Sequence, residues 1–172
     1  MSSVPAKNPP VVPAKPPQHE TAFIAAFVKA TVDTLSVQCG TKVVAGTPVS
    51  KGAHEDEGSE VIVIGGIVGT DIDCSVSFCF SETACAVLIG SMLQKKVKLG
   101  GEQVMAAASE MVRIIGFQAK KLLNDRGYKV EAVFPRVVLD GKDVRIWADK
   151  MRDGIVVPFS TARGDRFTLE IL

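Results

Sequence analysis

The pattern of apolar and polar positions along the chain predicts helices packed on a largely antiparallel sheet. Apolar residues recur at near-helical intervals in the stretch that begins near Glu20 and ends at Gly40, which is a candidate helix C-cap. A strand is expected in 41–50, followed by a charged loop. The nearly unbroken apolar run in 60–69 is typical of a strand covered on both faces. In 71–80, apolar residues alternate with Asp and Ser, and the short link Gly69–Thr70 favours an antiparallel pair.

The second half of the chain predicts two more helices and then several strands. Ser81 is a candidate N-cap for the first of these helices, and a long central helix is expected from about Glu102 to Asn124. Three or four strands follow, with boundaries at Asp140–Gly141, Asp153–Gly154 and Gly164–Asp165. We interpret Arg163-Gly164-Asp165 as a hairpin turn rather than a cell-adhesion motif. The predicted class is α+β: a largely antiparallel sheet packed against a pair of long helices plus an N-terminal helix.

Proline separates the first residues of the chain from the predicted domain. Residues 1–18 contain six of the nine prolines, a composition that disfavours helix and sheet and favours polyproline II. We therefore expect a disordered tail over 1–19 and one folded domain over 20–172. Two PxxP spacings in the tail suit a proline-reading partner, but a tethering or solubilising role is the favoured interpretation.

The composition of the chain argues against nucleic-acid binding, membrane insertion and a cysteine metal site. The 172 residues are 47% hydrophobic, and the formal net charge of +1 argues against a dedicated nucleic-acid surface. We find no apolar run approaching the about 18 residues that span a bilayer and no secretory signal, so we expect no membrane insertion and a cytoplasmic location. Cys39, Cys74, Cys79 and Cys85 form no CxxC pair and have no histidine nearby in sequence. The expected role of these cysteines is therefore that of small buried thiols, with no metal site.

The central helix carries the candidate functional residues. At 100° per residue, one stripe is apolar and faces the core: Val104, Ala108, Met111, Val112, Ile115, Ala119 and Leu122. The opposite, outward face holds Ala106, Glu110, Arg113, Phe117, Lys120 and Lys121. An exposed aromatic ring among charges is typical of a modest protein-contact patch. The equally open alternative is a surface Glu110–Arg113 pair contributing about 0.2–0.5 kcal/mol to helix stability.

These elements and the helix motif resemble the CheX, CheC and FliY chemotaxis phosphatase family, and the CheX type most closely. The resemblance aligns Glu110 with the family glutamate, Ile114–Ile115 with its aliphatic pair, Ala119–Lys120 with its Ala-Lys, and Pro135 with a downstream proline. It implies a homodimer formed through the sheet, a CheY-like receiver domain as partner, and hydrolysis of that partner's aspartyl phosphate. In the family, the glutamate docks on the receiver's lysine and an asparagine orients the attacking water. No cofactor is implied for this chain, since any Mg²⁺ would belong to the receiver.

Three positions on the outward face depart from the family motif. Arg113 replaces the catalytic asparagine, Phe117 replaces a glycine, and Ala106 stands where an Asp or Ser is usual in CheC-type motifs. A guanidinium has donors only, whereas an amide also offers an acceptor that can hold a water proton. We therefore expect a receiver-docking domain whose phosphatase activity is weak or lost. The contact set is Glu110, Arg113, Phe117, Lys120 and Lys121, and Glu110 and Arg113 are the candidate catalytic pair. An active aspartyl-phosphate phosphatase and a non-catalytic dimeric scaffold are the alternatives.

Overall fold

The computed structural model describes residues 20–53, 60–70, 72–98, 100–140 and 153–172, and for 134–140 it describes the backbone alone. The predicted tail, residues 1–19, lies outside these ranges. Within them the helices are α1 (Thr21–Cys39), α2 (Glu82–Leu93), α3 (Glu102–Asp125) and the short 3-10 helix η2 (Lys51–Ala53). The strands are β1 (Val43–Ala45), β2 (Val49–Ser50), β3 (Val61–Gly69), β4 (Ile72–Phe80), β5 (Val130–Asp140), β6 (Ile155–Thr161) and β7 (Arg166–Ile171).

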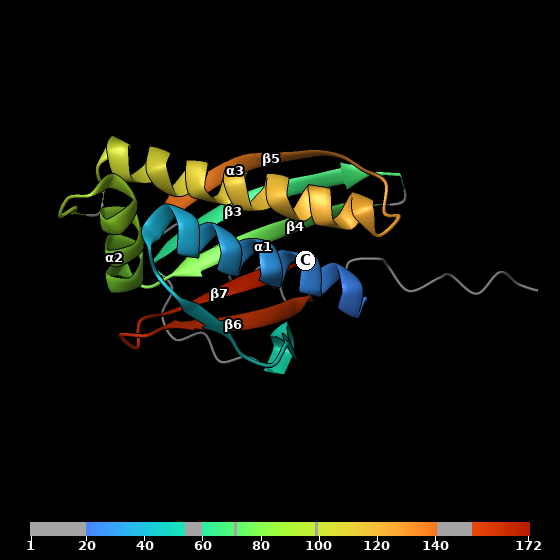
Figure 1. Ribbon diagram of the computed structural model, residues 1–172, viewed down its shortest axis with the longest axis horizontal. Helices are drawn as coiled ribbons and strands as arrows, with labels where there is room; N and C mark the ends of the chain where they lie inside the picture. The colour runs from blue at the N-terminus through green and yellow to red at the C-terminus, as the bar shows by residue number, and fades with distance from the viewer. Residues whose placement is uncertain (1–19, 54–59, 71, 99, 141–152) are drawn as a thin grey trace, which may run out of the picture.

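The strands form one antiparallel sheet, and the helices cover one of its faces. Over the described residues the sheet has seven strands in the order β1-β6-β7-β4-β3-β5, with β2 also paired to β6. α1 and α3 run side by side across the sheet, and the shorter α2 stands at one end of them (Figure 1). The predicted α+β class is confirmed, and the N-terminal helix is itself one of the two long helices.

β3 and β4 are neighbouring strands in the sheet. They pair in register from Val61 opposite Phe80 to Gly69 opposite Ile72, so the short link does join an antiparallel pair. The predicted alternation in β4 holds at Asp73, which is exposed, but not at Ser77 and Cys79, which are buried. The cause is that the face of the sheet away from the helices is also buried there. Ile62, Ile64 and Cys79 form a separate small cluster on that face.

The strand predicted over 41–50 is two short strands. β1 and β2 both pair with β6, and Gly46, Thr47 and Pro48 interrupt them. Pro48 has no backbone N–H, so one ladder hydrogen bond is missing where the two strands are interrupted. The Gly46 amide keeps the segment attached by donating to the Pro158 carbonyl at 2.7 Å.

Two predicted capping residues mark helix boundaries in the structure. Gly40 adopts the left-handed conformation at the end of α1 (φ 59°), and the Ser81 hydroxyl accepts from the Ala84 amide at 3.2 Å at the start of α2. Arg163-Gly164-Asp165 is the turn of the β6–β7 hairpin, as expected, with the Thr161 amide donating to the Asp165 carbonyl at 2.9 Å.

α1 corrects the expectation that no segment passes a test for a membrane span. Its mean hydropathy is 1.3 over an 18-residue window, which meets the length and composition criteria. Half of that window is buried inside the protein, where Phe23 and Phe27 join the core. A core helix passes the same test because its buried face supplies the apolar residues, so the finding is weak evidence for a span.

Gly116 allows α3 to approach β5 closely. A Cβ atom built at Gly116 would lie 2.4 Å from the Val133 Cγ1 atom, well inside contact distance. Valine is restricted to few rotamers, so it cannot turn aside easily. The glycine in this helix therefore packs against the sheet, one residue before the exposed Phe117.

We expect Gly116→Ala to lower the free energy of unfolding by about 1–3 kcal/mol, although alanine favours helix by about 1 kcal/mol. Chemical denaturation measures the change. Val133→Ala removes the clashing methyl group, so the double variant should recover much of the loss. If Gly116→Ala is equally destabilising in the Val133→Ala background, the close approach is not the cause.

Candidate partner-binding site on the central helix

α3 presents the predicted residues on its outward face. The apolar stripe is buried as expected at Val104, Ala108, Met111, Val112, Ile115 and Ala119. Leu122 is only half-buried, because Leu123, one turn beyond Ala119, takes the core position. Arg113 and Phe117 are exposed, and the Glu110 side chain retains 43% of its accessible surface. The prediction that these three side chains face outward is confirmed.

Glu110 and Arg113 form a two-point ion pair. The Arg113 Nε–H donates to Glu110 Oε2 at 2.6 Å, and the Nη2 group donates to Oε1. The spacing of three residues brings the two side chains together on the helix surface. Both carboxylate oxygens and one edge of the guanidinium are occupied, which leaves Nη1 and one Nη2 hydrogen for a further acceptor.

Phe117 extends this pair into a continuous row. The Arg113 guanidinium carbon lies 5.3 Å from the centre of the Phe117 ring, within the range of a cation–π contact. Phe117 is 47% exposed and is among the few large apolar side chains of the described residues that face solvent. An acid, a guanidinium and a ring therefore lie in sequence along the outward surface of α3. We call Glu110, Arg113 and Phe117 the contact row.

The two lysines beyond the contact row differ from each other. The Lys120 ammonium donates to the Glu131 carbonyl on β5 at 2.6 Å, so it ties α3 to the sheet edge. Lys121 is exposed. The expectation that both belong to one contact surface stays a prediction, with Lys120 the more constrained of the two.

The ion pair shifts both protonation equilibria in the expected directions. The hydrogen bonds and charge of Arg113 lower the pKa of the Glu110 carboxyl, and Glu110 raises the pKa of Arg113. At neutral pH the pair is fully charged and locally self-neutralised. The ring is then the apolar centre of a patch whose neighbouring charges cancel.

Replacing Arg113 by alanine should raise the pKa of Glu110 toward its ordinary value. Because the folded pKa is the lower one, the contribution of the pair is present at neutral pH and is lost as the pH falls below about 4. A ¹³C NMR titration of the Glu110 carboxyl measures both states. Lys121→Ala is the control and should leave this pKa unchanged. An identical Glu110 titration in the wild type and in Arg113→Ala would mean that the pair is not populated in solution.

The four cysteines are buried, as expected. Burial raises the pKa of Cys39 and Cys85 to about 11 and that of Cys74 to about 12. These three thiols therefore stay protonated at neutral pH. Over the part of the chain that the structure describes, no three His, Cys, Asp or Glu side chains group closely enough to hold a metal ion.

Solved structures with the same arrangement of elements include CheX and CheC-like proteins. A CheC-like superfamily protein from Shewanella sp. PV-4 superposes with a TM-score of 0.72 at 23% identity, covering 88% of this chain and 97% of its own. CheX from Vibrio vulnificus superposes with a TM-score of 0.73 at 21% identity, covering 87% and 97%. The chain has the CheX fold. CheX from Borrelia burgdorferi, solved as a complex with CheY, BeF₃ and Mg²⁺, superposes on the same fold with a TM-score of 0.70 at 19% identity, covering 87% and 96%.

Comparisons of sequence found no relative: no protein-family model matches the chain, and no curated protein matches it. The structural likeness shows the CheX fold, and the alignment of the helix motif stays a prediction. Of the matched positions, Glu110, Ile114–Ile115 and Ala119–Lys120 lie on α3, and Pro135 lies in β5 opposite Gly65 of β3.

Two contacts that shape the site were not predicted from the sequence. The first is the contact between Arg113 and Phe117, although a spacing of four residues on a helix is a sufficient signal for one. The second is the hydrogen bond from Lys120 to the backbone of β5, because that contact depends on how α3 crosses the sheet.

Proposed function

We propose that this chain docks on a CheY-like receiver domain through the contact row, and that its aspartyl-phosphate phosphatase activity is weak or lost. The observation that carries the proposal is the exposed Glu110–Arg113–Phe117 row at the position of the family motif on a CheX fold. A CheX from Borrelia burgdorferi has been solved with CheY, which supports a receiver domain as the partner.

In the proposed docking step, the ion pair between Glu110 and Arg113 opens and both side chains bind groups of the receiver instead. In the free protein, Glu110 and Arg113 satisfy each other at the surface. Opening such an exposed pair costs little, because median surface ion pairs contribute about 0–1 kcal/mol. In the complex, Glu110 would meet the receiver's lysine, as the family resemblance implies, and Arg113 would donate to oxygens of the phosphoryl group. Phe117 would then supply the apolar contact at the centre of the interface.

The same residues account for weak catalysis. Hydrolysis of an aspartyl phosphate depends on a water held in line with the phosphorus atom. Arg113 offers no acceptor for a proton of that water. Phe117 also places a bulky ring where the family has a glycine, and this ring restricts how closely a receiver approaches the helix. Homodimer formation through the sheet is part of the same resemblance and belongs equally to the scaffold alternative.

One assay separates the leading proposal from the active-phosphatase alternative. The purified chain is added to a phosphorylated receiver domain in the presence of the receiver's own Mg²⁺, and phosphate loss is followed. We expect acceleration of less than about tenfold over spontaneous hydrolysis, compared with the 10²–10³ that one positioned group typically contributes. Larger acceleration would favour an active enzyme in which Arg113 stabilises charge on the phosphoryl group. The absence of binding to any receiver domain, phosphorylated or not, would favour the scaffold.

A further inference from the structure

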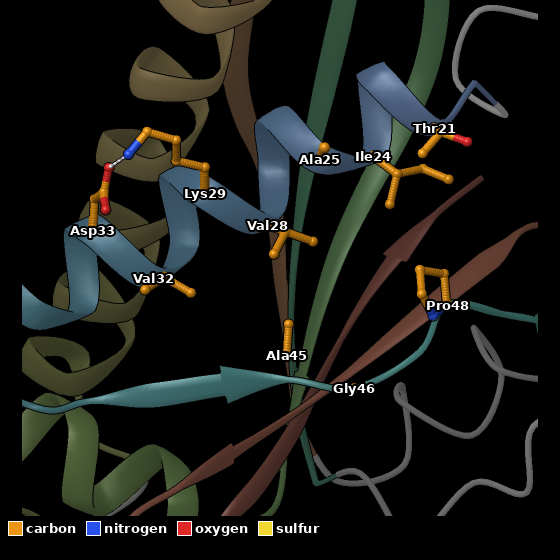
Figure 2. Close-up of a pocket in the computed structure, with 10 residues that line it drawn as sticks. All are labelled: Thr21, Ile24, Ala25, Val28, Lys29, Val32, Asp33, Ala45, Gly46 and Pro48. Atoms are coloured by element: carbon orange, nitrogen blue, oxygen red, sulfur yellow. Dashed lines mark hydrogen bonds and ion pairs between the residues drawn. The ribbon is translucent and has the colours of Figure 1, made fainter.

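An apolar groove separates α1 from the segment that joins β1 to β2. It has a volume of about 470 Å³ and opens to solvent. Figure 2 shows its two walls: Ile24, Val28 and Val32 on α1, and Ala45, Gly46 and Pro48 on the facing segment. Among the described residues that line it, the only charged ones are Lys29 and Asp33, which pair with each other at 2.8 Å. The groove therefore offers aliphatic surface with almost no polar anchor.

The chain enters the described fold at one end of this groove. Thr21, the first residue of α1, lines it, and residues 1–19 precede that point. The entry point is held in place, since the Tyr128 hydroxyl donates to the Glu20 carboxylate and Arg126 donates to the Ala22 carbonyl. Glu20 itself has φ −75° and ψ 140°, which are polyproline II angles.

The geometry of the groove matches a short proline-rich segment. From Thr21 to Asp33 the helix rises about 18 Å, at about 1.5 Å per residue. About six residues of polyproline II cover that distance, at about 3.1 Å each. Residues 11–16, Val-Val-Pro-Ala-Lys-Pro, are six residues long and include two of the three valines that precede Thr21. Residues 17–20 remain for the reversal of direction at the helix start.

A segment of the same chain needs only a weak contact to occupy the groove, because it is attached next to it. Grooves that capture free proline-rich peptides are usually lined with aromatic rings, and the described residues that line this one include none. A segment attached at Thr21 is instead present at an effective concentration on the order of millimolar. We propose that the α1–β1 groove is the intramolecular binding site for residues 11–16 of the same chain. Valine and proline side chains of this segment fill the space between Val28 and Pro48.

Methyl NMR of the full-length chain tests this proposal. Val11→Asp with Val12→Asp places two charges in the segment and should move the methyl signals of Ile24, Val28 and Val32, without changing the melting temperature. Lys7→Asp, which also adds negative charge before Thr21 but outside the segment, should leave them unchanged. A synthetic peptide of residues 1–19, added to the doubly substituted chain at millimolar concentration, should return the signals toward wild type.

Two outcomes would overturn the proposal. Groove signals that are identical in the wild type and in the doubly substituted chain would mean that residues 11–16 do not occupy the groove. Groove signals that move with protein concentration, and equally in both chains, would assign the groove to a second copy of the protein.

Discussion

Phe117→Asp should weaken receiver-domain binding by about 30-fold or more while leaving the melting temperature nearly unchanged. The ring is 47% exposed, so its removal takes little from the core, and surface substitutions usually change stability by less than about 0.5 kcal/mol. At the centre of an interface, an aromatic ring commonly contributes about 2 kcal/mol or more, which corresponds to about 30-fold in affinity. Isothermal titration calorimetry with a phosphorylated-state analogue of the receiver measures the loss.

Two further variants distinguish the effect on binding of losing the Phe117 ring from the effect of adding a negative charge. An aspartate at 117 stands four residues after Arg113 and competes with Glu110 for its guanidinium. Phe117→Ala removes only the ring and should still cost most of the affinity. Val37→Asp is the matched control, since Val37 is a 77% exposed apolar residue on α1, and its replacement should leave binding intact. Full affinity in both Phe117 variants would show that the contact row is not the docking surface.

The fold was largely predictable because its signals are local. The N-cap at Ser81, the left-handed Gly40 and the link at Gly69–Thr70 each specify one boundary through backbone chemistry that neighbouring residues determine. The end of α3 was predicted for the same reason. There Asn124 also bonds to both backbone groups of Val130, with Val130 N–H to Oδ1 at 2.8 Å and Nδ2 to the carbonyl at 3.1 Å.

What could not be predicted depends on packing between elements distant in sequence. Ser77 and Cys79 follow the alternating pattern of a half-exposed strand, yet both are buried, and Cys79 clusters with Ile62 and Ile64 of the neighbouring strand β3. From the sequence, Gly116 is only a residue of low helix propensity. Its role in packing depends on Val133, which β5 places against it. Neither fact is encoded in the residues next to it.

The candidate site could be predicted only in part. Helical periodicity is sufficient to place Glu110, Arg113 and Phe117 on the outward face, and the structure confirms that placement. Which face a helix exposes follows from its own apolar stripe. The partner of that face does not follow from the stripe, and the docking and catalytic roles of the row stay predictions.

Arg113→Asn should raise the rate of receiver dephosphorylation by about tenfold or more. The substitution replaces a group that only donates hydrogen bonds with an amide whose carbonyl accepts one from a water. It also releases Glu110 from its two-point ion pair, so the carboxylate is available to the receiver's lysine. The gain should stay below the 10²–10³ typical of one positioned catalytic group, because the exposed Phe117 ring still limits how closely a receiver approaches the helix.

The control for this prediction is Arg113→Ala, which frees Glu110 equally but supplies no amide. If release of the carboxylate were the whole effect, Ala and Asn would raise the rate alike, and the interpretation of position 113 as the water-orienting position would be wrong. If Asn alone raises the rate, the acceptor is responsible. At saturating concentrations of the receiver, where weaker binding does not lower the rate, adding Phe117→Gly to Arg113→Asn should then increase the rate further, because removal of the ring lets the receiver's phosphoryl group come closer to the amide.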